Sequence, residues 1–254
     1  GDVSGSIDDL MRHAITKLAH LHFASTEASA ERIRRMGEEA WRVHVVGDNH
    51  IDSIVAVDYH SPQVVARDLG LDLAKPIVVV LQHSETTAPE AAYDQMIETL
   101  VAVRDFGHQT VVIHPCSDVG YDGIIRAIGE IALPPQFRVR VNLDAPYFWG
   151  LLAIASVLVG NSSAGLIETP TFRLPAVNVG RRQIGRLFAE NVLHVDHNRH
   201  AIGKALATAL SDAFRQVAAT CNQPFGDGRA GQRVYETLRD IPLDRKLMLK
   251  RLVW

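Results

Sequence analysis

Cysteine is scarce in this sequence of 254 residues, which contains only Cys116 and Cys221. Two cysteines cannot build a disulfide framework, and their scarcity predicts a reducing compartment, the cytoplasm. An excess of one charge is lacking too, because 26 basic and 29 acidic residues leave a net charge of -3. This balance gives no electrostatic reason to expect a nucleic acid or an anionic membrane as a partner.

Long hydrophobic runs are also absent. No apolar stretch approaches the length of a membrane-spanning helix, and the N-terminus has no basic segment followed by the apolar core of a signal peptide. We therefore expect no membrane partner. The hydrophobic share of 47% is still enough, over 254 residues, to bury at least one full core.

Histidine is well represented, with 12 copies, which raises the question of a metal site. The closest groups are His20 with His22, and His194 with His197 and His200. The first pair would lie on a short strand, and the second group lies in a polar turn without nearby cysteine. A metal site is the less favoured interpretation of both, and we expect no metal and no other cofactor.

Most of the chain alternates between short aliphatic runs and longer amphipathic segments. The runs predict strands at 77–81, 110–113, 137–141, 157–159, 175–179 and 191–195. The segments between and after them predict helices at 89–106, 122–131, 146–155 and 201–219. This alternation is typical of an α/β fold with a Rossmann-like, doubly wound parallel sheet, in which ligands bind at the carboxyl ends of the strands.

Residues 1–60 predict too little sheet to fold alone. They contain helices at 7–18, after Ser25 or Thr26 up to Gly37, and at 51–55, with strands only at 20–23 and 41–46. We therefore interpret them as the end of a first domain. The expected divisions are a first-domain remnant at 1–60, a linker at 61–75 that contains a helix at 62–69, a ligand-binding domain at 76–230 and a C-terminal helical tail at 231–254. The basic end of this tail is expected to pack on whatever apolar surface is offered.

The stretch from Val157 to Glu168 is central to the functional interpretation. A buried strand ends in small polar and glycine residues, where Ser162 or Ser163 can cap a helix. Free amide N–H groups at a helix start favour a phosphate, and the carboxylate of Glu168 suits a ribose diol. An ordinary strand-to-helix turn is an equally good interpretation of this stretch alone.

Three other loops carry polar residues to the same predicted edge of the sheet: 82–83, 114–118 and 180–185. His83 could donate to a phosphate or act as an acid or base, and Arg182 could bind a phosphate or carboxylate. Each residue taken singly is better explained as an ordinary loop residue, and Cys116 as an unreactive thiol. The agreement of four strand ends favours the phosphate interpretation.

Several of these stretches together resemble a known family. They are Gly5–Asp9, Arg12–Phe23, Gly160–Gly165 with Glu168, Gly180–Arg186, Glu190–Leu193 and Phe225–Gly228. The pattern closely resembles the hydrolysing UDP-N-acetylglucosamine 2-epimerases, which make N-acetylmannosamine for sialic-acid-type sugars, and it runs along nearly all of the chain. The non-hydrolysing epimerases share the fold, but their strand-to-helix turn resembles Thr-Asp-Ser-Gly-Gly.

The resemblance implies a GT-B-like fold of two Rossmann-like domains, of which this chain holds the second and part of the first. It implies that UDP is eliminated from UDP-GlcNAc to leave a 2-acetamidoglucal, to which water then adds. His83 would act on the leaving diphosphate as the catalytic residue. The implied UDP-binding residues are His83, Cys116, Ser162, Ser163, Glu168 and Arg182.

The sequence departs from the family pattern in three respects. Cys116 follows Pro115 where the family commonly has asparagine, and Gly47-Asp48-Asn49 replaces the usual Gly-Ser-Pro. We also expect the family's opening strands, with their arginine, aspartate and glutamate positions, to precede Gly1. The implied partners are UDP, a UDP-sugar and further copies of the chain. Two alternatives remain open: an epimerase for a UDP-diacetamido sugar, and a UDP-sugar-binding remnant without turnover.

Overall fold

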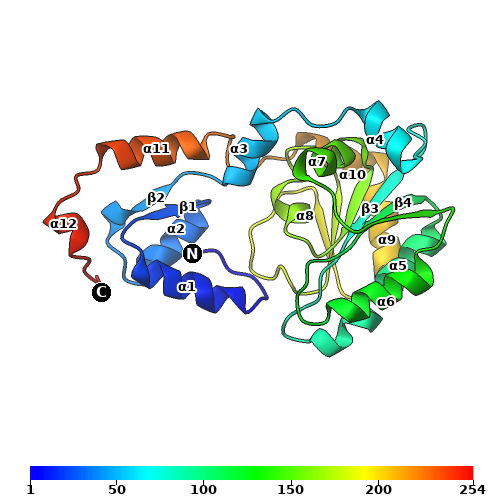
Figure 1. The fold of residues 1–254 in the computed structure, drawn as a ribbon, viewed down its shortest axis with the longest axis horizontal. Coiled ribbons are helices and arrows are strands. Elements are labelled where there is room, and N and C mark those ends of the chain that lie inside the picture. The colour runs from blue at the N-terminus through cyan, green and yellow to red at the C-terminus, as the bar shows by residue number, and fades with distance from the viewer. Residues whose placement is uncertain (254) are drawn as a thin grey trace.

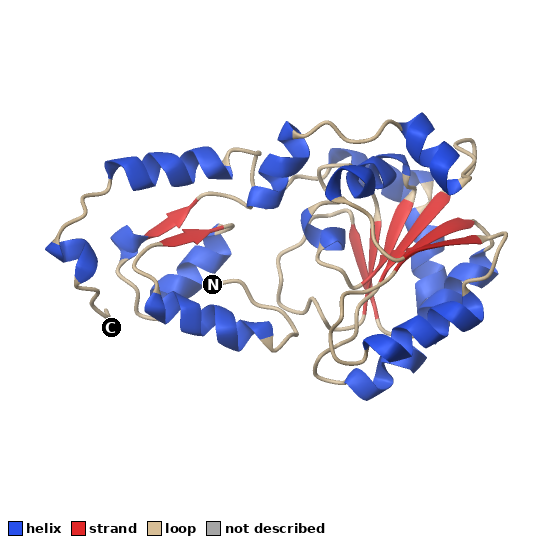
Figure 2. Cartoon of the chain, viewed as in Figure 1, coloured by secondary structure: helices blue, strands red, loops and turns tan. Residues whose placement is uncertain are grey.

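A six-stranded parallel sheet organises the larger part of the molecule, which a computed structural model describes over residues 1–253 (Figures 1 and 2). Its strands are β3 (Ile77–Leu81), β4 (Gln109–Ile113), β5 (Phe137–Arg140), β6 (Val157–Gly160), β7 (Ala176–Val179) and β8 (Val192–Val195). Their spatial order is β5-β4-β3-β6-β7-β8. This is the doubly wound order of a Rossmann fold, so the predicted fold class is confirmed.

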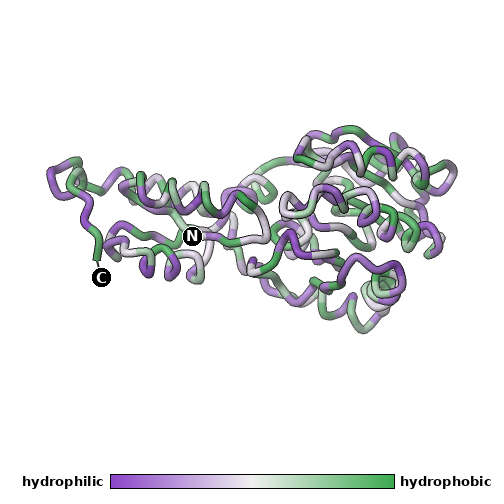
Figure 3. Tube along the Cα trace, turned by 90° about the horizontal axis from the view of Figure 1, so that it is seen from below, coloured by the Kyte–Doolittle hydropathy of each residue, from purple (hydrophilic) through white to green (hydrophobic). Residues whose placement is uncertain are grey.

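Two apolar layers cover the faces of this large sheet. Val78 and Val80 of β3 face the helices α5 (Ala92–Phe106), α6 (Tyr121–Ile131) and α9 (Arg199–Ala209). Ile77 and Val79 face the opposite layer, which contains α3 (Asn49–Ala56), α4 (Pro62–Leu69) and α7 (Ala145–Ile154). Hydrophobic and hydrophilic residues accordingly alternate along the helices in Figure 3, as expected for helices with one packed face.

The chain reverses its direction of winding between β3 and β6, which are neighbours in the sheet. Gly160, the last residue of β6, has a φ of 136°. A Cβ atom at this position would overlap the carbonyl oxygen of Leu81 on β3. Only glycine allows this backbone conformation together with so close an approach, and this brings the loops after β3 and β6 together.

A second, small sheet lies toward the N-terminus. Its two parallel strands are β1 (His22–Ala24) and β2 (Val43–Val45), and α1 (Asp8–Leu18), α2 (Glu27–Arg35) and a 3-10 turn (Ala40–Arg42) accompany them. Ile51 and Ile54 of the following helix, α3, pack into the core of the large sheet. The proposed division of the chain near residue 60 stays a prediction.

The helix predicted at 201–219 is two helices in the structure, which corrects that expectation. α9 ends at Ala209 and α10 (Asp212–Thr220) begins after Ser211. The Ser211 hydroxyl accepts a hydrogen bond from the Phe214 amide at 3.2 Å. An N-cap of this kind starts a new helix even though the apolar periodicity continues across the break.

The C-terminal tail contains α11 (Ala230–Asp240) and α12 (Arg245–Met248), and it runs back beside the small sheet (Figure 1). Leu247 of α12 is buried, and buried polar groups also hold the basic end, so its expected docking on apolar surface stays a prediction. Lys250 donates to the Glu38 carboxylate at 2.7 Å, and Arg42 donates to the backbone of α12. Trp254, the last residue of the predicted tail, lies outside the described residues. Within residues 1–253, none of the helices has both the length and the apolar character needed to cross a membrane.

Candidate functional site

The loops after β3 and β6 are joined by a pair of hydrogen bonds at the reversal point of the sheet. The backbone N–H of His83 donates to Oδ1 of Asn161 at 2.7 Å, and Nδ2 of Asn161 donates to the carbonyl of His83 at 2.8 Å. Asn161 therefore pairs with His83 as a neighbouring strand would. The carboxyl end of a doubly wound sheet at its reversal point is the usual ligand-binding crevice of this fold.

The imidazole of His83 is held in one orientation by the loop after β4. The backbone N–H of Cys116 donates to Nδ1 of His83 at 3.2 Å, which assigns the ring proton to Nε2. Burial and the nearby positive charge of Arg182 lower the pKa of His83 to about 4. At neutral pH the ring is therefore uncharged and presents an Nε2–H donor.

Cys116 has an exposed thiol beside this histidine. Its Sγ lies 3.1 Å from Nδ1 of His83 and donates to Oδ2 of Asp118 at 3.2 Å. Burial and the neighbouring carboxylate of Asp118 raise the pKa of the thiol, so Cys116 stays protonated at neutral pH. The contacts of Cys116 serve to orient His83, and its role in nucleotide binding stays a prediction.

Arg182 brings a positive charge to the same place from the loop after β7. Its side chain is 17% exposed, and its Nη1 donates to the carbonyl of Asn161 at 3.3 Å. Asp118 lies 3.6 Å from its Nη2. The buried Nε–H has no acceptor among residues 1–253. A partly buried guanidinium with an unused donor beside a neutral imidazole is suited to bind an anion.

Ser162 and Ser163 follow Asn161 and precede the short helix α8 (Ala164–Ile167). The Ser162 hydroxyl accepts from the Ala164 amide at 3.3 Å, whereas Ser163 occupies the N-cap position without a capping hydrogen bond from its side chain. The backbone N–H groups of both serines have no acceptor among the described residues. They are therefore free to donate to a ligand.

Glu168 directly follows α8, and its carboxylate accepts a hydrogen bond from Nε1 of Trp149 on α7 at 2.8 Å. Burial raises the pKa of Glu168, and the negative charge of Asp48 adds to the shift, while Trp149 and the nearby His50 oppose it. Trp149 was not among the residues that the sequence analysis singled out. A buried tryptophan needs an acceptor for its N–H, and this was the only available signal.

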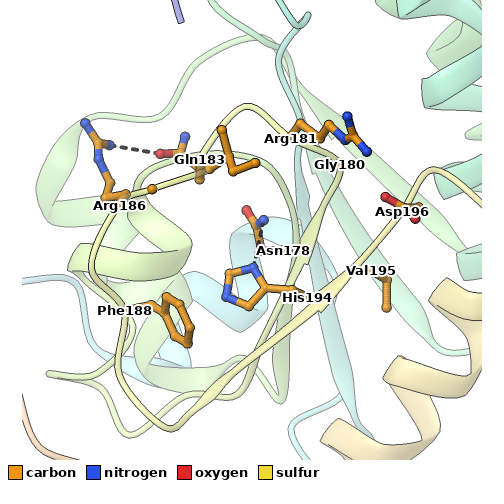
Figure 4. A pocket seen from close by; sticks show the side chains of 11 residues that line it. Asn178, Gly180, Arg181, Gln183, Arg186, Phe188, His194, Val195 and Asp196 are labelled. Atoms are coloured by element: carbon orange, nitrogen blue, oxygen red, sulfur yellow. Dashed lines mark hydrogen bonds between the residues drawn. The ribbon is translucent and has the colours of Figure 1, made fainter. Parts of the chain in front are cut away.

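A cavity of about 370 Å³ lies beneath the loop after β7, beside this group of residues (Figure 4). Asn178 and His194 form part of its floor, with 3.2 Å between Nδ2 of Asn178 and Nδ1 of His194, and Phe188 packs edge-on against His194. Arg181 and Gln183 also line the cavity, but none of the six predicted site residues does.

The profile of one protein family, described as UDP-N-acetylglucosamine 2-epimerase, matches residues 1–239. The chain belongs to the UDP-N-acetylglucosamine 2-epimerase family. This match covers both sheets and all four loops that form the site.

Individual members of this epimerase family match most of this chain but are longer than it. The chain is 34% identical over 250 residues to a UDP-N,N'-diacetylbacillosamine 2-epimerase (hydrolyzing) of Legionella pneumophila, covering 98% of this chain and 65% of that protein. It is 29% identical over 211 residues to a UDP-N-acetylglucosamine 2-epimerase of Neisseria meningitidis, covering 83% of this chain and 55% of that protein. The chain thus spans between half and two thirds of their length.

Solved structures of the epimerase family have the same fold. The UDP-GlcNAc 2-epimerase of Neisseria meningitidis bound to UDP-GlcNAc superposes with a TM-score of 0.74 at 14% identity, covering 89% of this chain and 63% of that one. A putative UDP-N-acetylglucosamine 2-epimerase of Listeria monocytogenes gives 0.70 at 19% identity, covering 88% and 60%. At these identities the likeness concerns the fold alone.

The predicted site of this epimerase-family chain is therefore assembled in part. His83, Cys116 and Arg182 meet around Asn161, and the two serines continue from it. Glu168 belongs to a separate set of contacts around Trp149. The bridging role of Asn161 and the position of Asp118 were not predicted, although both residues lie in loops that the sequence analysis singled out.

Proposed function

We propose that this chain is the UDP-binding part of a hydrolysing UDP-N-acetylglucosamine 2-epimerase, which converts UDP-GlcNAc to UDP and N-acetylmannosamine. The observation that carries the proposal is the anion-binding group at the reversal point of the sheet. It combines the neutral His83, the unused Nε–H of Arg182 and the free amides of Ser162 and Ser163. The family membership of the chain supports the same interpretation.

Each of these groups has a role in the proposal. Nε2–H of His83 and the guanidinium of Arg182 donate to the diphosphate, together with the serine amides. Glu168 accepts hydrogen bonds from the ribose hydroxyls, since Trp149 engages only one of its two oxygens in the described structure. In this arrangement, hydrogen-bond donors of the protein face the phosphates of UDP, and an acceptor of the protein faces the ribose diol.

The proposed reaction has two steps. A base removes the proton from C2 of the sugar while the bond between C1 and the diphosphate oxygen breaks, which releases UDP and leaves a double bond between C1 and C2. Water then adds its oxygen to C1 and a proton to C2 on the face that gives N-acetylmannosamine. Negative charge grows on the leaving diphosphate during the first step, and hydrogen-bond donors fixed beforehand stabilise that charge.

Replacement of Glu168 by alanine should weaken UDP binding. The loss should be a few-fold to a hundredfold, about 1–3 kcal/mol, because the ribose hydroxyls lose a partner in a dry environment. Calorimetric titration with UDP measures the change. Glu190→Ala is the matched control, since Glu190 is an exposed carboxylate of the same part of the chain. Equal affinity in the unaltered and Glu168→Ala proteins would remove the ribose assignment.

UDP binding should be accompanied by proton uptake at His83 below neutral pH. The free histidine has a pKa of about 4, and a bound diphosphate stabilises its charged form and raises that value. Between the two pKa values the complex holds more protons than the free protein, so affinity rises as the pH falls. Calorimetry at pH 5 in two buffers of different ionisation enthalpy counts the protons.

The His83→Ala protein is the control for this proton count, because the terminal phosphate of UDP itself titrates at about pH 6. The difference between the unaltered and His83→Ala proteins isolates the histidine. If both take up the same number of protons, His83 stays neutral in the complex and the predicted rise of its pKa is wrong.

A UDP-diacetamido sugar is the second candidate substrate. It is favoured by the similarity to the Legionella protein, whose name specifies UDP-N,N'-diacetylbacillosamine and which matches 98% of this chain. Release of UDP from the two UDP-sugars, compared at equal concentration in an enzyme of the family's full length, separates the candidates. A polypeptide that binds UDP but releases none from either sugar would instead be a binding remnant without turnover.

A further inference from the structure

Glu85 lies two residues after His83 and contacts a distant part of the chain. It is 7% exposed, and its Oε1 accepts a hydrogen bond from the backbone N–H of Arg181 at 2.6 Å. His197 places its Nε2 3.0 Å from the same oxygen. Glu85 therefore ties the loop after β3 to the loop after β7 and to the turn after β8.

The backbone conformation at Gly180 allows the Glu85 carboxylate to approach closely. Gly180 has a φ of 79°, and a Cβ atom there would overlap both Nε2 of His197 and Oε1 of Glu85. Hydrogen bonds from His197 and from the amides of Arg181 and Arg182 keep the pKa of Glu85 below its ordinary value despite burial. The carboxylate is thus charged at neutral pH and surrounded by donors from the loop after β7 and from the turn after β8.

Arg182 is the residue on which these contacts bear. Glu85 holds the backbone at Arg181, the residue immediately before Arg182. On the other side of Arg182, Nε2 of Gln183 donates to the carbonyl of Asn161 at 2.7 Å. Because the backbone is held on both sides of Arg182, its side chain starts from a fixed position, and its guanidinium lies beside Asn161 and Asp118. A side chain held in this way loses less conformational freedom when it binds an anion.

We propose that Glu85 is a positioning residue, which holds the Gly180–Arg182 backbone so that Arg182 points at the diphosphate of the nucleotide. The role rests on the proposed binding of UDP. Glu85 itself touches no ligand, and its effect on affinity passes through Arg182.

A double-mutant cycle with UDP tests this role. Glu85→Ala should weaken UDP binding about five- to fiftyfold in the otherwise unaltered protein, and by less than about twofold in an Arg182→Ala background, because the two residues act as one unit. Glu85→Gln keeps an oxygen that accepts from the Arg181 amide, and it should recover most of the affinity. Equal effects of Glu85→Ala in both backgrounds would overturn the proposal.

Two further measurements separate positioning from a general loss of stability. The amide proton of Arg181 should exchange with solvent severalfold faster in Glu85→Ala than in the unaltered protein, without any ligand present. Glu98→Ala is the matched control, since Glu98 also accepts from a distant backbone amide, that of Arg199 at 2.7 Å, but contacts no site residue. A loss of UDP affinity in Glu98→Ala as large as that in Glu85→Ala would contradict the positioning role.

The failure of this proposal can be told from the failure of the proposed function. If the unaltered chain binds no UDP, the proposed function falls and the positioning role falls with it. Suppose instead that the unaltered chain binds UDP, and that Arg182→Ala weakens this binding whereas Glu85→Ala leaves it unchanged. In that case only the positioning role is overturned.

Discussion

Replacement of His83 by alanine is expected to lower kcat by about 100- to 1000-fold, the usual cost of removing one donor that stabilises charge in a transition state. KM should change much less, because the charge on the diphosphate grows as the bond to C1 breaks and a donor fixed at Nε2 gains most at that point. The Cys116 amide on Nδ1 and the lowered pKa keep the ring in this donor form.

Steady-state kinetics with UDP-GlcNAc measure the effect in an enzyme of the family's full length. His83→Gln retains an N–H donor and should recover part of the lost rate. His108→Ala is the matched control, since His108 packs edge-on against Phe106 just before β4, at the other end of the strands. A His83→Ala enzyme with an unchanged kcat and a raised KM would make His83 a ground-state binder.

Local patterns in the sequence were sufficient to locate most helices and strands. The helix at Pro62–Leu69 agrees to the residue, because Ser61 caps it, Pro62 suits its first turn and Gly70 ends it in the left-handed conformation. The strand at Ile77–Leu81 agrees as well, since a continuous aliphatic run suits a strand buried on both faces. At Ser211 the apolar periodicity of the predicted helix continued while the serine favoured a new N-cap, and the boundary between α9 and α10 was missed.

The candidate site was predictable only as a set of loops. Parallel strands deliver their carboxyl ends to one edge, so the four polar loops were expected to meet, and contacts among His83, Cys116, Asn161 and Arg182 confirm that they do. The hydrogen bonds that hold these loops together join residues far apart in the sequence. The separation is 33 positions for His83 and Cys116, 78 for His83 and Asn161, and 96 for Glu85 and Arg181. No spacing rule links such positions, so Glu85 could not be singled out from the sequence.

The tail of the chain shows the same limit. Its basic end was expected to pack on apolar surface, and the structure adds a polar partner that was not predicted, the fully buried Arg42, 204 residues before Lys246. Arg42 donates to the carbonyls of Lys246 at 2.8 Å and Leu247 at 2.9 Å, and to the Glu39 carboxylate at 2.7 Å. One planar guanidinium with five donors can satisfy several carbonyls that would otherwise be unpaired.

Replacement of Arg42 by alanine should therefore release the tail from the small sheet. Removing one partner from a buried charged network costs about 3–5 kcal/mol, because the groups left behind stay buried without partners. Arg42→Lys should restore only part of this lost stability, since a single ammonium group cannot donate to all the acceptors that the planar guanidinium reaches. Limited proteolysis with trypsin measures the release as faster cleavage after Arg245 and Lys246.

Arg239→Ala provides the comparison that decides the cause of that cleavage. Arg239 also belongs to the tail, but its ion pair with Asp240 on α11 is exposed, and exposed pairs contribute little to stability. Its loss should leave the cleavage rate at Arg245 and Lys246 unchanged. If Arg42→Ala is cleaved no faster than Arg239→Ala, the tail is held by other contacts, foremost the Glu38 carboxylate with Lys250, and the role given to Arg42 is wrong. If only Arg42→Ala is cleaved faster, the buried hydrogen-bond network of Arg42 holds the C-terminal tail on the small sheet.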